Sequence, residues 1–150
     1  MTLEEISAIE AIRALKARYF RLVDTKQWDA WGDVFTPDVK VVIDGDVQTP
    51  GRTPPQEVLE GRDTFVGFAR ERLTGGVSVH HGHMPEIEVL SRTEARGVWA
   101  MEDIVERDGV SFHGHGHYHE TYRNDGDGWR IASLRLTRLR RSVLPPAPRQ

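Results

Sequence analysis

At 150 residues the chain has the length of one ordinary domain, and 38% hydrophobic with 29% charged residues is typical of a globular protein. A net charge of −3 argues against a protein that binds nucleic acid by electrostatic attraction. No apolar run approaches the roughly 18 residues of a membrane span, which argues against a membrane protein. The chain has no cysteine and no N-terminal secretory signal, so we exclude disulfides and thiolate metal ligands and expect a cytoplasmic location.

The first predicted element is a long N-terminal helix. Thr2 and Glu5 form a capping box, in which a hydroxyl and a carboxylate satisfy backbone N–H groups at a helix start. Apolar side chains then recur at steps of three and four and predict one core-facing stripe: Ile9, Ile12, Leu15, Tyr19 and Leu22.

A short second helix is predicted next. Trp28, Trp31 and Phe35 share its spacing, and it should end at Thr36, because the residue before a proline disfavours helical geometry. The β-branched residues 40–44 predict a strand.

A proline-rich loop separates that strand from a third helix. Pro50, Gly51, Pro54 and Pro55 predict a loop over the surface. Apolar residues between 65 and 73 then predict a helix that ends before two glycines at 75 and 76.

Four strand patterns follow without an intervening helix, and their ranges are 77–90, 95–107, 110–124 and 129–141. Residues that tolerate positive φ connect the last three, so we expect consecutive hairpins and an antiparallel sheet. We interpret the basic run at 135, 138, 140 and 141 as a solvated strand end. The chain is predicted to form a single α+β domain over residues 1–142, followed by a Pro-rich tail over residues 143–150.

All seven histidines lie in two of these strands. His113, His115, His117 and His119 alternate with other residues, so strand geometry places all four imidazoles on one face. Together with the stretch His81-Gly82-His83, which resembles the metal motif of a cupin barrel, they raise the alternative of a metal site. Cupins are almost wholly strand, whereas this chain has three helical patterns. We therefore expect no metal and no cofactor, and a polar sheet face that is solvated or lies in a subunit interface.

Two carboxylates occupy unusual positions. Asp24 ends the core-facing helix, where it either caps the following turn or faces a site. Asp103 interrupts a strand on the face of Trp99 and Met101, where the period of two calls for an apolar group. The alternative is a bulge that turns Asp103 out to solvent.

Several motifs along the chain resemble the SnoaL-like branch of the nuclear transport factor 2-like superfamily, from Ile6 to Arg140. They are the helix end YFRLVD, then WDAWGDVFTPDV, GRD before the third helix, HHGHMPEIEV, GHYHETY and GWRI. The resemblance implies a cone-shaped α+β barrel, in which a long helix and a strongly curved antiparallel sheet enclose a pocket. Within the branch the chain is most similar to small lyases of the hexachlorocyclohexane dehydrochlorinase and bile-acid dehydratase type.

The resemblance also implies catalytic residues. The helix-end aspartate of these lyases falls on Asp24, their strand histidine on His80, a tyrosine on Tyr19 and a second acid on Asp103. Their arginine falls on Leu134, and we expect Arg138, further along the same strand face, to replace it.

The face that would line the pocket in the histidine-rich strand corresponds to Gly114, Gly116 and Tyr118. The resemblance therefore implies that His115 and His117 point outward, into the interface of a homo-oligomer, a dimer or trimer.

These residues lead to the hypothesis of a cofactor-independent elimination. His80 removes a proton from carbon and Asp24 orients the imidazole, while Tyr19 donates a hydrogen bond to an oxyanion and a protonated Asp103 assists the leaving group. The substrate is expected to be a small apolar molecule of alicyclic, aromatic or polyketide type, and its pocket walls are Val41, Trp99, Met101 and Tyr118, with Arg138. An isomerase, hydratase or cyclase with the same groups stays open, as does a non-catalytic ligand-binding or assembly domain.

Overall fold

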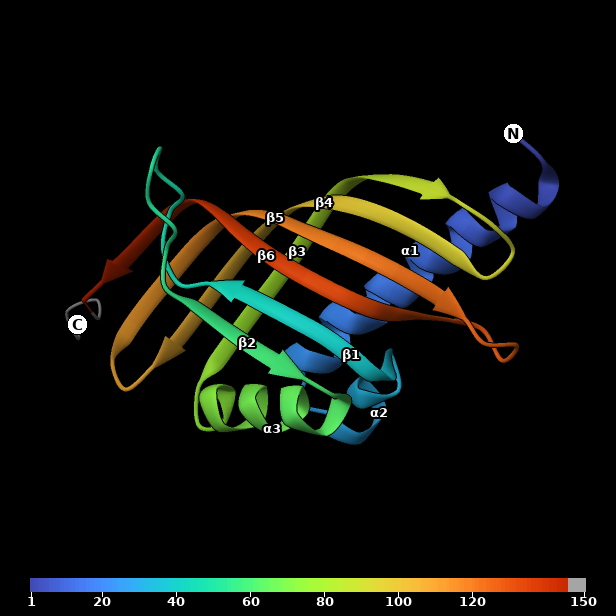
Figure 1. Ribbon diagram of the computed structural model, residues 1–150. Coiled ribbons are helices and arrows are strands. Elements are labelled where there is room, and N and C mark those ends of the chain that lie inside the picture. Colours follow the sequence, from blue (N-terminus) through green and yellow to red (C-terminus); the bar gives the residue numbers. More distant parts are fainter. Residues whose placement is uncertain (146–150) are drawn as a thin grey trace.

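The computed structural model describes residues 1–145, which form three helices and one six-stranded sheet (Figure 1). The elements in chain order are α1 (Leu3–Asp24), α2 (Trp28–Gly32), β1 (Phe35–Asp44), β2 (Gln56–Glu60), α3 (Arg62–Leu73), β3 (Val77–Val89), β4 (Glu94–Arg107), β5 (Val110–Asn124) and β6 (Trp129–Leu144).

The sheet is strongly curved, and its strand order is β2-β1-β6-β5-β4-β3 (Figure 1). Strands β3 to β6 form the predicted antiparallel meander, and β2 pairs antiparallel with β1. The prediction of a wholly antiparallel sheet is wrong at one place, since β1 pairs with β6 in parallel. A parallel pair needs a long crossover, which the intervening elements provide. The sheet remains open, with β2 and β3 at its edges.

Helix α1 begins at the predicted capping box. The Thr2 hydroxyl accepts a hydrogen bond from the Glu5 amide at 3.1 Å, and the Glu5 carboxylate accepts one from the Thr2 amide at 2.7 Å. The helix lies along the concave face of the sheet and buries its apolar stripe there (Figure 1). The expected fold, a long helix packed on a curved sheet, is therefore confirmed.

The structure corrects three predicted boundaries. Helix α2 ends at Gly32, and Phe35 is the first residue of β1, which starts five residues earlier than predicted. A short strand, β2, follows the proline-rich loop and was not predicted, because four of its five residues are exposed and show no apolar alternation. Strand β6 continues past Arg141 to Leu144.

The C-terminal tail was predicted over residues 143–150. Val143 and Leu144 pair with Phe112 and Ser111 in β5, and residues 146–150 lie outside the described part of the chain. Among residues 1–145, no helix is long and apolar enough to cross a membrane.

Candidate active site

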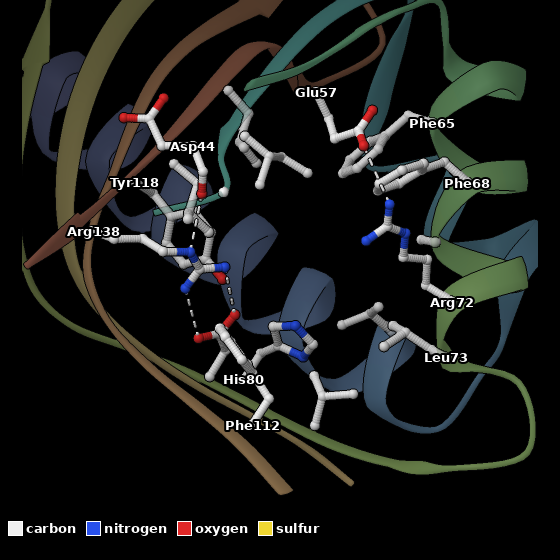
Figure 2. A pocket seen from close by; sticks show the side chains of 18 of the residues that line it. Asp44, Glu57, Phe65, Phe68, Arg72, Leu73, His80, Phe112, Tyr118 and Arg138 are labelled. Carbon is white, nitrogen blue, oxygen red and sulfur yellow. Dashed lines mark hydrogen bonds and ion pairs between the residues drawn. The ribbon is translucent and has the colours of Figure 1, made fainter. Parts of the chain in front are cut away.

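A cavity of about 470 Å³ opens between α3, the end of α1 and the concave face of the sheet (Figure 2). This volume is in the range of sites for small organic molecules. Most of its wall is apolar or aromatic and includes Val23, Trp31, Phe65, Phe68, Val105, Phe112, Leu134 and Leu136. The fold therefore leaves a largely apolar pocket beside the helix end at which Asp24 stands.

Asp24 and His80 meet at this pocket. The His80 Nδ1 atom lies 2.6 Å from the Asp24 Oδ1 atom, although the two residues are 56 positions apart in the chain. The His80 side chain is 12% exposed and the Asp24 side chain is 21% exposed. The His80 imidazole lines the cavity (Figure 2). With Nδ1–H donating to the carboxylate, the Nε2 atom carries the free lone pair.

Two further donors fix the Asp24 carboxylate. The His80 backbone amide donates to Oδ2 at 2.8 Å, and the Ser78 hydroxyl donates to Oδ1 at 2.9 Å. The carboxylate thus binds the start of β3 rather than capping its own turn, where the Thr25 amide and hydroxyl instead donate to Arg21. Three donors hold the carboxylate in the position needed to orient the imidazole.

Tyr19 and Tyr118 line the same cavity, and their rings meet edge to face at a centroid distance of 5.9 Å. Burial raises the pKa of both hydroxyls well above the ordinary value of 10, so both stay protonated. The Tyr118 hydroxyl has no hydrogen-bond partner among residues 1–145. Tyr118 was predicted as a wall only, and its buried hydroxyl stands beside that of Tyr19.

Asp103 is buried, with 5% of its surface exposed, so the alternative of a bulge that exposes it is wrong. Its two carboxylate oxygens face the Arg138 guanidinium at 3.2 and 3.4 Å (Figure 2). That Asp103 acts as a proton donor to the leaving group stays a prediction. Arg138 is itself buried and not a solvated strand end, and it donates to the Asp44 carbonyl at 3.1 Å.

The residues predicted as pocket walls lie in two places. Tyr118 and Arg138 line the cavity, whereas Val41, Trp99 and Met101 are buried in the adjacent core. Trp99 and Met101 face inward as the period of two predicted, and Val41 is buried as well. In the strand of Trp99 and Met101, the residues that reach the cavity are Asp103 and Val105, further along β4. The core around Trp99 is filled by the Phe20 ring from α1.

A second buried pair went unpredicted. The Lys16 Nζ atom lies 2.8 Å from the Glu120 Oε2 atom with both side chains fully buried, and it stands 3.6 and 3.8 Å from the ring centroids of Tyr19 and Tyr118. Burial lowers the pKa of Lys16 to about 8, and Glu120 opposes that shift. The sequence signal was a lysine directly beside Leu15, on the edge of the apolar stripe of α1.

The histidine-rich strand presents Gly114, Gly116 and Tyr118 to the buried side, as expected, and its imidazoles remain partly or fully exposed. Among residues 1–145, no three histidine, aspartate or glutamate side chains gather closely enough to hold a metal ion. That the histidine face lies in a subunit interface stays a prediction.

The sequence matches the family model described as a SnoaL-like domain over residues 4–135. The probable cyclase FGR4 of Gibberella zeae is 29% identical over 139 residues, which cover 88% of this chain and 91% of that relative.

Solved structures show the same fold. A hexachlorocyclohexane dehydrochlorinase, LinA type 2, superposes with a TM-score of 0.81 at 17% identity and covers 97% of both chains. A scytalone dehydratase-like protein of Novosphingobium aromaticivorans gives a TM-score of 0.77 at 19% identity, over 100% of this chain and 99% of the other. At these identities the likeness shows the fold alone.

Proposed function

Since the chain belongs to the SnoaL-like domain family, we propose that it is a cofactor-independent lyase whose Asp24–His80 dyad eliminates a group from a small organic molecule. The molecule is of alicyclic, aromatic or polyketide type, because the cavity wall is largely apolar.

One observation supports the proposal above the others, namely the imidazole held by a carboxylate with its second nitrogen free at the cavity. An imidazole ionises near neutral pH, so it suits general base catalysis. The Asp24 carboxylate, 2.6 Å from Nδ1, stabilises the imidazolium that forms when Nε2 takes a proton. A ligand-binding domain has no need of such a dyad at its cavity wall.

In the proposed reaction the His80 Nε2 atom removes a proton from a substrate carbon. The C–H electron pair becomes a new carbon–carbon double bond, and the bond from the adjacent carbon to the leaving group breaks. The leaving group departs with that bond's electron pair as an anion, and the imidazolium then releases its proton to the leaving group or to water.

Tyr19 and Tyr118 are the proposed hydrogen-bond donors to charge that develops on the substrate. Both hydroxyls remain neutral because burial raises their pKa. A donor of this kind, fixed in a cavity of low polarity, stabilises an oxyanion without rearranging.

A cyclase is the second candidate, and the similarity to the probable cyclase FGR4 favours it. The first step is the same proton removal by His80. The carbanion then attacks a carbonyl carbon of the same molecule, a C–C bond forms, and the resulting alkoxide is protonated. Product mass separates the two reactions, because elimination loses the leaving group and a proton whereas ring closure leaves the mass unchanged.

The test is turnover of a panel of alicyclic halides and alcohols and of polyketide-type ketones, followed by mass spectrometry. We expect His80→Ala and Asp24→Asn to lower kcat on the order of 10²–10⁴-fold while the circular dichroism spectrum stays native. His83→Ala, which changes an exposed imidazole of the same strand, is the matched control and should keep wild-type turnover. Wild-type kcat in both dyad variants would contradict the proposal.

A further inference from the structure

Strand β6 contains a β-bulge at Leu139. His115 pairs with Arg140 and Gly116 pairs with Arg138, so Leu139 has no partner in β5, and it is 69% exposed. A bulge shifts the alternation of side chains beyond it by one position. Arg138 and Arg141 are three residues apart and in a regular strand would face opposite sides, but here both face the concave side.

Arg141 consequently lies in one row with the dyad. His80 pairs with Asp103 on the neighbouring strand, Asp103 pairs with Gly114, and Gly114 pairs with Arg141. The row crosses β3, β4, β5 and β6, so the ends are three strand spacings, or roughly 14 Å, apart along the backbone. His80 and Arg141 both line the cavity. Gly114 contributes no side chain between them, and the Asp103–Arg138 pair occupies that space.

In the described part of the chain, three arginines line the cavity, and two of them form ion pairs with carboxylates, whereas Arg141 does not. Arg138 pairs with Asp103 at 3.2 Å and Arg72 pairs with Glu57 at 3.2 Å (Figure 2). Within residues 1–145, the Arg141 guanidinium has neither an ion-pair partner nor a hydrogen bond. Its Cζ atom stands 5.5 Å from the centroid of the Phe112 ring, which also lines the cavity.

We propose that Arg141 is a substrate-binding residue that holds a carboxylate of the ligand at the rim of the pocket, so that the substrate is a small aromatic or alicyclic acid. The inference rests on the proposed function, because it assigns the substrate class of that same pocket. A guanidinium presents a planar fork of donors that matches a carboxylate. The apolar wall accepts the rest of the molecule, and the carbon that loses its proton lies at the His80 end of the row.

The experiment compares binding of two probes of equal shape, 2-naphthoate and 2-naphthamide, by isothermal titration calorimetry. Wild-type protein should bind the carboxylate about tenfold more tightly than the amide, as a charge-assisted hydrogen bond provides. Arg141→Gln should remove this preference, and added salt should weaken it in the wild type. Arg140→Gln is the matched control, since Arg140 is the adjacent arginine on the convex face, and it should keep the preference.

Equal affinity for both probes in the wild type, no binding of either, or a preference that survives Arg141→Gln would each overturn the proposal. The preference needs no turnover, so it should also persist in His80→Ala. A retained preference in a protein without eliminating or cyclising activity would leave the binding site standing and refute the proposed function. Activity that depends on His80, without a preference for the carboxylate probe, would support the proposed function and refute the role of Arg141.

Discussion

Charged side chains in the core of this protein form two kinds of pair. Asp24 and His80 remain partly accessible, and the His80 imidazole lines the cavity. Lys16 and Glu120 are fully buried, and Glu120 also accepts a hydrogen bond from the Tyr122 hydroxyl, which in turn accepts one from the Trp99 indole. The first pair is the proposed catalytic dyad, whereas the second holds a polar network inside the core.

Replacing Lys16 by methionine should lower the free energy of unfolding by about 3–5 kcal/mol, because the Glu120 carboxylate is left buried without its cation. Urea denaturation followed by circular dichroism measures the loss. The double variant Lys16→Met/Glu120→Gln should lose less than Lys16→Met alone. Wild-type stability of the single variant would mean that the pair contributes nothing.

Tyr118→Phe should separate stability from activity. The hydroxyl is buried and without a partner among residues 1–145, so its removal should leave the free energy of unfolding unchanged or higher. If the hydroxyl donates to the substrate, kcat should fall about 10²–10³-fold. Tyr122→Phe, which breaks a hydrogen bond to Glu120, should instead lower stability. Unchanged kcat in Tyr118→Phe would show that the ligand does not use this donor.

At the scale of elements, local irregularities in the strands of the meander bring Arg138 and Arg141 to the cavity. The bulge in β6 turns two arginines to one face, and the glycines of β5 leave room for them. A Cβ atom at Gly114 would collide with Asp103 Oδ1 and Arg138 Nη1. The absence of a side chain there is what allows the Asp103–Arg138 pair to form.

Gly114→Ala should therefore destabilise the protein by about 1–3 kcal/mol, because the ion pair must separate to admit the methyl group. Gly67→Ala makes the same chemical change in α3, where nothing lies within 4 Å of the new Cβ, and should stabilise by about 0.5–1 kcal/mol. Chemical denaturation of both variants provides the comparison. Equal stability of the two would argue against the tight packing at Gly114.

For the molecule as a whole, all three tyrosines lie in one core between α1 and the sheet. Burial is the largest cause that raises the pKa of Tyr19, Tyr118 and Tyr122 above the ordinary value of 10. The hydroxyls ionise near pH 10 only in the unfolded chain, which then binds fewer protons than the folded protein.

The free energy of unfolding should consequently fall as the pH rises above 10, by about 1.4 kcal/mol per tyrosine for each pH unit. Phenolate absorbance and far-ultraviolet circular dichroism should change together in one cooperative step. The chain unfolded in guanidinium chloride is the control and should titrate gradually near pH 10. Gradual phenolate formation in the folded protein would show that the tyrosines are accessible.

The sequence alone determined the features that depend on neighbours in the chain. The capping box at Thr2, the stripe of α1 and the hairpins of the meander follow from local spacing and turn chemistry, and all three are present. The combination of Asp24 with His80 came from a family resemblance. Local spacing in the sequence does not predict this contact, because Asp24 and His80 are 56 positions apart.

Only the tertiary structure decided which part of the concave face is cavity and which is core. A period of two predicts that Trp99, Met101 and Asp103 share one face of a strand, but it does not say which of them a helix covers. The Phe20 ring of α1 packs against Trp99, so the cavity begins further along the strand, at Asp103. The bulge that turns Arg141 toward the cavity depends on how β6 pairs with β5. The sequence of β6 alone does not determine that pairing, because the register is set by both strands.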